Sequence, residues 1–350
     1  MRATGIVMWA MTTLSLGKAA DPFHPGPAND VWMWNDVENA TCLNGKSTGV
    51  YVKYGNSSNV GIYLNGGGAC FNLATCETCA KSNKPSPPGV SGIFSSTDSR
   101  NPFKDFNWIA VPYCTGDVHI GDMVAKVGLE TRTFRGAGNL RLIAERAKAT
   151  WPSVSTLLVT GESAGGFGAF SGYDIIRSYW DEEGTRGIML DDSGPVLDDD
   201  ALAPCLQSEW RSIWNLNESL PDGCPCIGNS GNLVSAWKFG MQKWGAQGDS
   251  FGLISSLEDA VISGFFAYGE NDCKRVIPIG YNKLADGLSR LSKSGVPIYM
   301  ISGSEHTHTG DKNEFYTRNV SGVALYEWVT DLANPNVPDP PSVSPSQRKG

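Results

Sequence analysis

The sequence predicts an α/β fold in which helices flank a mostly parallel central sheet. Residues 154–161, VSTLLVTG, are apolar on both faces of an extended strand, as in the middle of a parallel sheet. Three further strand candidates, at 186–194, 251–261 and 295–303, alternate with helix-compatible stretches. The 350 residues, of which 41% are hydrophobic, are enough to bury one large core or two small ones.

The N-terminal half supplies the remaining elements. Residues 31–55 alternate apolar and polar side chains around a turn signal, which predicts an antiparallel hairpin. A β-rich run over 59–68 ends in three glycines, and a strand over 108–111 is closed by a proline. Apolar residues at helical spacing predict one helix over 136–152, stopped by a proline, and the segment 164–179 predicts another.

The chain divides into a leader, one domain and a tail. Residues 1–20 place Arg2 before an apolar run of secretory length and end in small residues, which predicts a signal peptide and a secreted protein. This run is too short to span a bilayer, and an uncleaved N-terminal strand or anchor is the alternative. The predicted α/β domain covers 21–333, with a cap insertion rich in cysteine and tryptophan at 201–245. The Pro- and Ser-rich tail, 334–350, is expected to be disordered.

Charge and cysteine content restrict the function. The net charge of -8 comes without a dense Lys/Arg tract, which argues against nucleic acid or an anionic membrane as partner. Nine cysteines suit disulfides in a secreted chain, and an odd number leaves at least one thiol over or pairing between chains. Cys76-x-x-Cys79 and Cys224-x-Cys226 have no histidine at ligand spacing nearby, so disulfides are expected there and no metal or cofactor.

A serine stands at the end of the predicted central strand. The pentapeptide GESAG at 161–165 fits the pattern G-x-S-x-G, which places a nucleophile on a sharp strand-to-helix turn where only very small neighbours fit. The apolar strand before it and the helix after it are the context that this geometry demands. Ser163 is therefore the candidate nucleophile, and an incidental serine in a plain turn is the alternative.

A serine hydroxyl needs a base, and histidine is the usual one. The chain has four histidines, namely His24, His119, His306 and His308. In this type of fold the histidine follows both the serine and the acid, on a loop after the last strands. His306 is preferred because it is the first to leave the strand near 301, and a solvated loop pair is the alternative for His306 and His308. His119 precedes the serine, so it is assigned with Asp117 to the pocket wall.

The acid that orients the imidazole should follow a strand between the serine and the histidine. Asp191 and Asp192 follow one such strand, and Glu258 and Asp259 follow another. Spacing alone leaves both pairs open, with a surface carboxylate as the alternative for each.

Backbone N–H groups must stabilise the oxyanion that forms during attack. The residue after the nucleophile, Ala164, supplies one, and Gly67 and Gly68 follow an early strand where glycine lets the backbone approach a substrate. A flexible turn is the alternative for the glycines, and a phosphate loop is disfavoured because no Lys-Ser/Thr follows them.

Five stretches together resemble the pectinacetylesterase/Notum family of secreted carboxylesterases, most closely its microbial members. They are YLNGGGACFNLATC, PYCTGDVHIGD, TGESAGGFGAF, DDSGP and SGSEHT. The resemblance implies an α/β-hydrolase fold and ester hydrolysis through an acyl-enzyme. By motif match, Ser163 is the nucleophile and His306 the base, with Gly67, Gly68 and Ala164 as the oxyanion hole.

The resemblance also bears on the acid and on specificity. The family's acid lies in the later strand-end segment, which favours Asp259 over Asp192, while a one-residue shift would select Glu258. The chain has Gly-Gly-Gly-Ala before Cys70, where the animal branch has an aromatic residue beside its oxyanion glycines. That departure puts the lipid specificity of the animal branch in doubt for this chain.

The expected function is a secreted, monomeric serine esterase that removes short acyl groups, acetyl above all, from a polysaccharide such as pectin. Four of the eleven tryptophans lie in 201–245, where they could stack on sugar rings or pack in the core. The alternatives are a Notum-like lipid deacylase for longer acyl chains and a catalytically silent carbohydrate-binding homologue.

Overall fold

The fold is described from a computed structural model of the chain. The structure describes residues 20–24, 26, 30–181, 184–228, 232–269 and 281–345. The predicted signal peptide thus lies outside the described residues, apart from Ala20.

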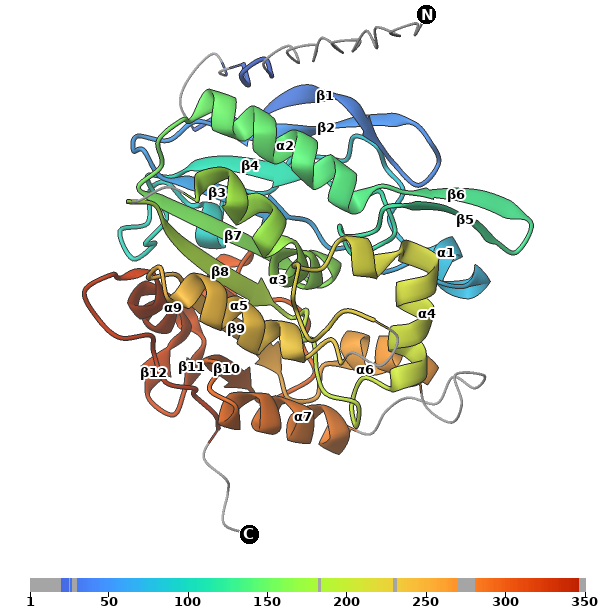
Figure 1. Cartoon of the computed structure of the whole chain (residues 1–350). Helices are drawn as coiled ribbons and strands as arrows, with labels where there is room; N and C mark the ends of the chain where they lie inside the picture. Colours follow the sequence, from blue (N-terminus) through green and yellow to red (C-terminus); the bar gives the residue numbers. More distant parts are fainter. Residues whose placement is uncertain are drawn as a thin grey trace, which may run out of the picture.

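Eight strands of the described chain form one mixed sheet in the order β1-β2-β4-β3-β7-β8-β9-β10 (Figure 1). β1 and β2 form the predicted antiparallel hairpin, β2 pairs antiparallel with β4, and every pairing from β4 to β10 is parallel. The strands span Met33–Thr41 (β1), Ser47–Lys53 (β2), Val60–Leu64 (β3), Asn107–Val111 (β4), Thr156–Glu162 (β7), Arg186–Asp192 (β8), Ser250–Ser256 (β9) and Ile298–Ile301 (β10). The predicted α/β class with a mostly parallel sheet is confirmed.

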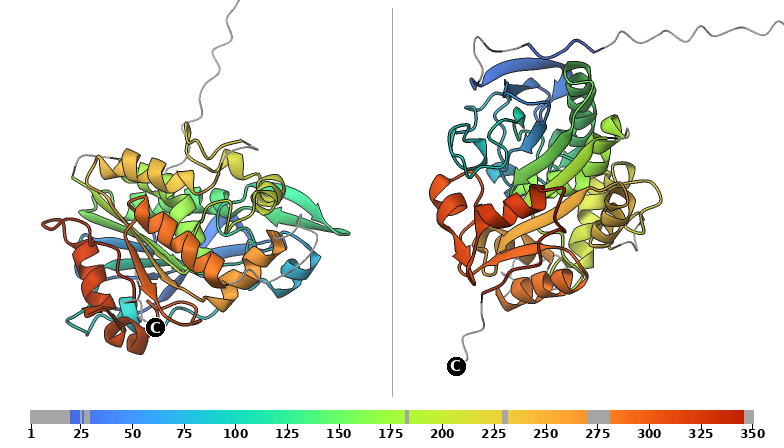
Figure 2. Two further views of the ribbon diagram at one scale, coloured as in Figure 1. Left: turned by 90° about the horizontal axis from the view of Figure 1, so that it is seen from below. Right: turned by 90° about the vertical axis from the view of Figure 1, so that its left-hand side faces the viewer.

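Helices cover both faces of this sheet (Figure 2). Leu157 and Val159 of β7 belong to one buried cluster and the intervening Leu158 to another, because successive side chains of a strand point to opposite faces. The first cluster includes apolar side chains of α2, α3, α5 and α7, and the second those of α8 and α9. These helices span Gly136–Thr150 (α2), Ala164–Arg177 (α3), Ser235–Gly245 (α5), Tyr281–Lys293 (α7), Lys312–Thr317 (α8) and Leu325–Ala333 (α9).

The described chain also contains smaller helices and strands outside these layers. They are α1 (Leu73–Thr78), the ribbon β5 (Met123–Val127) and β6 (Glu130–Phe134), α4 (Pro204–Trp214), α6 (Ala260–Phe266), β11 (Asn319–Val320) and β12 (Val323–Ala324). Among the described helices, none is both long and apolar enough to cross a membrane.

The predicted cap insertion at 201–245 contains two different structures. α5 is the crossover helix between the parallel strands β8 and β9, and its Trp237 and Trp244 are buried against α3 and the sheet. Trp210 and Trp214 on α4 are also buried. Only the part with α4 therefore resembles a cap, and all four tryptophans pack in the interior.

The prediction of a disordered tail from residue 334 is wrong for its described part. The Val343 amide donates to Ile298 O (2.8 Å), and Val343 O accepts from the Met300 amide (2.8 Å). Trp328 Nε1 donates to Pro341 O (2.9 Å). The composition is that of a flexible tail, but a single apolar residue covers the open edge of β10. Residues 346–350 lie outside the described residues.

Disulfides fix the loops at the early strand ends. Cys42 is bonded to Cys114 and Cys70 to Cys76, and Cys224 is bonded to Cys226. Cys79 is free and buried, in line with the odd number of cysteines. Of the two motifs that could suggest zinc, the first contributes only Cys76 to a disulfide, so the expectation was wrong for Cys79, and the second closes on itself.

Candidate active site

Ser163 occupies the turn between β7 and α3, in a backbone conformation that residues other than glycine rarely adopt. Its φ is 55° and its ψ is -121°. A Cβ on Gly161 would lie 2.3 Å from Gly165 O, and one on Gly165 would lie 1.9 Å from Leu64 O. Both glycines are therefore required by space, and the turn lifts a half-buried serine at the carboxyl edge of the sheet.

Asp259 and His306 form the closest carboxylate–imidazole pair of the site. His306 Nδ1 donates to Asp259 Oδ2 across 2.7 Å. Asp259 is fully buried, and its Oδ1 accepts the amides of Val261 and Ile262 (2.9 Å each) as the N-cap of α6. The other ring nitrogen, His306 Nε2, is buried and has no hydrogen-bond partner within the described part of the chain. A proton held on Nδ1 leaves Nε2 free to accept one.

The other two candidates for the acid have different surroundings. Glu258 is exposed to solvent. Asp192 is fully buried, and its Oδ2 accepts the amides of His308 and Thr309 (2.8 Å each) and the Thr309 hydroxyl (2.7 Å). Asp192 thus anchors the loop that carries His306, and its O accepts the Ser163 amide (2.8 Å), so one residue ties both segments together.

Asp191 and His308, which lie close to these groups in the sequence, make hydrogen-bond contacts within the fold. Asp191 is buried and accepts the Gly194 amide (2.8 Å), and burial raises its pKa well above the ordinary range. His308 is fully buried, with Nε2 3.1 Å from Ser256 Oγ, so it is not the solvated loop histidine that was the alternative for it.

The glycine loop after β3 lies against the serine turn. A Cβ on Gly66 would lie 2.9 Å from Ser163 Cβ. Gly67 and Gly68 have φ values of 153° and 80°, and Gly67 O accepts the Ala80 amide (2.7 Å). Positive φ explains why glycines stand here, and the Cys70–Cys76 disulfide directly after them holds the loop. The structure therefore brings Gly68, Ser163 and Ala164 to one pocket.

The assignment of Asp117 and His119 to the pocket wall needs correction. Both side chains are buried, and the residue between them, Val118, lines the pocket instead. Asp117 accepts the Thr115 hydroxyl (2.6 Å) and the Gly136 amide (2.8 Å), and burial raises its pKa to about 6. His119 Nε2 donates to Asn65 O (2.9 Å), and burial lowers the pKa of His119 to about 4. These two residues support the loops around the pocket.

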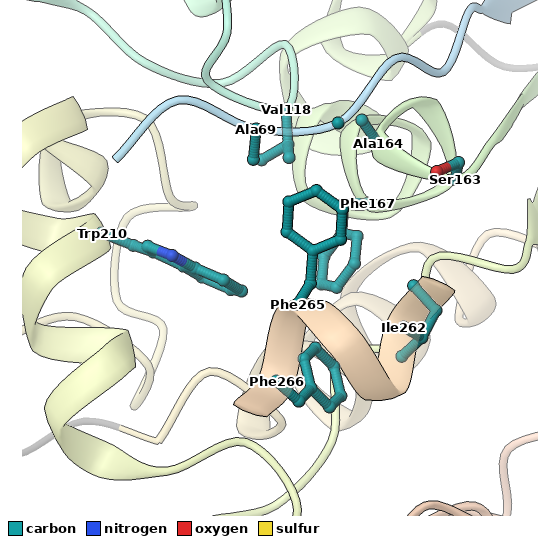
Figure 3. Close-up of a pocket in the computed structure, with 10 residues that line it drawn as sticks. Ala69, Val118, Ser163, Ala164, Phe167, Trp210, Ile262, Phe265 and Phe266 are labelled. Atoms are coloured by element: carbon teal, nitrogen blue, oxygen red, sulfur yellow. The ribbon is translucent and has the colours of Figure 1, made fainter. Parts of the chain in front are cut away.

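An apolar pocket opens beside Ser163 (Figure 3). It is lined by Gly68, Ala69, Val118, Ser163, Ala164, Phe167, Trp210, Ile262, Phe265 and Phe266. The centre of a water molecule can move through about 20 Å³ of this pocket. The free space therefore suits a small substituent.

Most of this lining, and one carboxyl group beside it, are not among the residues that the sequence predicts for the site. The aromatic residues of α4 and α6 carry no motif, so no signal in the chain points to them. Glu162 lies beside the serine, and the Tyr63 hydroxyl donates to it. Burial, and after it the charge of Asp192, raises the pKa of Glu162, which is also close enough to interact electrostatically with His306. Its place inside G-x-S-x-G was the available signal.

Comparison with known proteins decides the family. Residues 29–225, more than half of the chain, match the family model described as pectinacetylesterase. The chain belongs to the pectinacetylesterase family. The match includes Ser163 and the glycine loop, whereas Asp259 and His306 lie beyond it, so their assignment depends on the geometry above.

Relatives of this pectinacetylesterase family member carry two kinds of name. The palmitoleoyl-protein carboxylesterase notum1 of Xenopus laevis is 31% identical over 177 residues, which cover 46% of this chain and 36% of the relative. Pectin acetylesterase 11 of Arabidopsis thaliana is 31% identical over 153 residues, or 41% of this chain and 39% of the relative. The chain therefore spans between a third and a half of the length of these relatives.

Proposed function

We propose that the protein is a secreted serine carboxylesterase that hydrolyses short acyl esters, acetyl esters above all, through an acyl-enzyme. The observation that carries the proposal is the Asp259–His306 pair, in which His306 Nε2 has no hydrogen-bond partner among the described residues, at the edge of the sheet that also presents Ser163. Family membership and the two kinds of relative support ester hydrolysis.

The proposed reaction follows from these groups. Ser163 Oγ attacks the ester carbonyl carbon while its proton passes to His306 Nε2, and Asp259 stabilises the resulting imidazolium. The amides of Ala164, Gly67 and Gly68 stabilise the oxyanion. The intermediate expels the alcohol, which takes the proton from His306 and leaves the acyl group on Ser163. Water then attacks this ester with the same base, which releases the acid and restores the serine.

The size of the pocket supports a short acyl group. Its free space of about 20 Å³ beside Ser163 accommodates the methyl group of an acetyl ester, and its apolar walls favour hydrocarbon over a charged substituent. An acyl chain of many carbons would require the aromatic side chains to move.

The acceptor is proposed from the relatives alone. The name of one relative, pectin acetylesterase 11, refers to an ester of a polysaccharide, which supports a carbohydrate acceptor. The tryptophans of 201–245 no longer support it, because Trp210, Trp214, Trp237 and Trp244 are buried. The disulfides support secretion. A monomer remains the expectation.

A lipid deacylase is the second candidate. The relative named a palmitoleoyl-protein carboxylesterase and the largely apolar pocket lining favour it. It predicts higher kcat/KM on octanoyl than on acetyl esters.

Ester kinetics test the proposal. Initial rates on nitrophenyl acetate, butyrate, octanoate and palmitate should fall steeply after acetate. Ser163→Ala should abolish hydrolysis of these esters. Ser178→Ala, at an exposed serine directly after helix α3, should leave it unchanged. Undiminished hydrolysis by Ser163→Ala would refute the proposal, and a maximum at octanoate would select the second candidate.

A further inference from the structure

A second apolar cavity lies behind the pocket beside Ser163. It provides about 10 Å³ by the same measure, and its lining includes Phe170, Trp214 and other apolar side chains. Three residues line both cavities, namely Val118, Phe167 and Trp210. The wall between the cavities therefore consists of these side chains.

Aromatic rings make up most of this wall. Phe167 comes from α3, one turn after Ser163, and Trp210 comes from α4. Their rings meet edge to face with centroids 5.9 Å apart. In Figure 3, Ser163 and Trp210 lie on opposite sides of the pocket, and Phe167 lies between them. An acyl chain on Ser163 that grew into the pocket would thus meet these rings.

Trp210 is held differently from its neighbours. Trp214 Nε1 donates to Cys70 O (2.9 Å) and Trp237 Nε1 donates to Val196 O (3.2 Å). Trp210 Nε1 is buried and has no hydrogen-bond partner among the residues described. Within the described structure this indole is therefore positioned by packing, and its removal breaks no hydrogen bond there.

We propose that Phe167 and Trp210 form a wall that sets the acyl-chain length, and that loss of either ring joins the two cavities into one apolar channel. The inference rests on the proposed esterase function and deepens it. Burial of one further methylene group of the acyl chain in the transition state raises kcat/KM about fourfold. In the wild type the wall prevents the distal carbons of a long acyl chain from being buried. In the channel of a variant these carbons become buried.

The test compares kcat/KM on nitrophenyl octanoate with that on nitrophenyl acetate. The ratio cancels any difference in the amount of folded enzyme. Phe167→Ala and Trp210→Ala should each raise the ratio at least about tenfold, since two or more methylenes gain burial. Phe170→Ala is the matched control, because Phe170 lines the second cavity without forming the wall and stacks on Trp237 at 4.2 Å. Its ratio should match that of the wild type.

A milder variant guards against loss of folding. Val118→Ala shortens the third side chain of the wall and should raise the ratio about fourfold or more. A ratio equal to that of the wild type in Val118→Ala and in every folded ring variant would overturn the wall, as would a wild type that already prefers octanoate. Failure of the esterase proposal is distinct, because then no ester is hydrolysed or Ser163→Ala remains as active as the wild type.

Discussion

Ionisation of the buried Asp117 carboxyl should lower the stability of the protein as the pH rises from about 4 to about 6. Burial raises the pKa of Asp117 from 3.8 to about 6, although the Thr115 hydroxyl and the Gly136 amide both bond to it. Between these two pH values the unfolded chain releases a proton that the folded protein keeps, so ionisation progressively favours the unfolded state. Above pH 6 the full penalty applies. At about 1.4 kcal/mol per pH unit, it is about 3 kcal/mol.

Asp117→Asn removes the ionisation and retains groups that can pair with Thr115 and Gly136. The free energy of unfolding of this variant relative to the wild type should therefore increase by about 3 kcal/mol between pH 3.5 and pH 7.5. The lowered pKa of His119 acts in the opposite sense between pH 6.5 and about 4, but it is common to both proteins.

Urea denaturation with the disulfides intact, monitored by tryptophan fluorescence, measures this difference. Asp181→Asn, at an exposed carboxylate, is the control and should give a flat difference. A difference for Asp117→Asn that also stays flat between pH 3.5 and pH 7.5 would refute the reasoning, because the buried carboxyl would then be neither desolvated nor perturbed.

Two further variants test the site. Asp259→Asn should lower kcat on nitrophenyl acetate about 10⁴-fold with little change in KM, because the wrong imidazole tautomer is then favoured, whereas Glu258→Gln at the exposed neighbour should stay within about twofold. Equal losses in the two variants would contradict the choice of acid. Gly165→Ala should lower stability on thermal unfolding by about 3 kcal/mol or more, because its Cβ would lie 1.9 Å from a backbone oxygen. Its control is Gly264→Ala, whose Cβ would meet no atom of the described residues within 4 Å, so this variant should be neutral or stabilising by up to about 1 kcal/mol. A Gly165→Ala protein as stable as the wild type would contradict the account of the turn.

The serine turn was predictable because its constraints are local. Steric crowding at Gly161 and Gly165 acts within five residues of one strand end, so a short pattern contains it. The central strands were predictable for the same reason, because a strand that is buried on both faces has a continuous apolar sequence.

The identity of the acid is a tertiary property. Asp192 is the last residue of β8 and Asp259 comes shortly after β9, and distance along the chain does not tell which of the two carboxylates meets His306. The α6 N-cap turns Asp259 toward the imidazole, while Asp192 is engaged by the amides of His308 and Thr309.

The pocket and the tail were hidden for a related reason. The pocket lining comes from segments more than a hundred residues apart, such as Val118 and Phe265, and each alone resembles ordinary core. The tail has the composition of a flexible segment, and the single pairing of Val343 with β10 is invisible to composition.

Covalent labelling tests the central claim most directly. A fluorophosphonate applied to the folded protein, followed by peptide mapping, should label Ser163, and His306→Ala should slow the labelling strongly because the serine then lacks its base. Label on another serine, or labelling of Ser163→Ala as fast as that of the wild type, would contradict the assignment of Ser163 as the nucleophile.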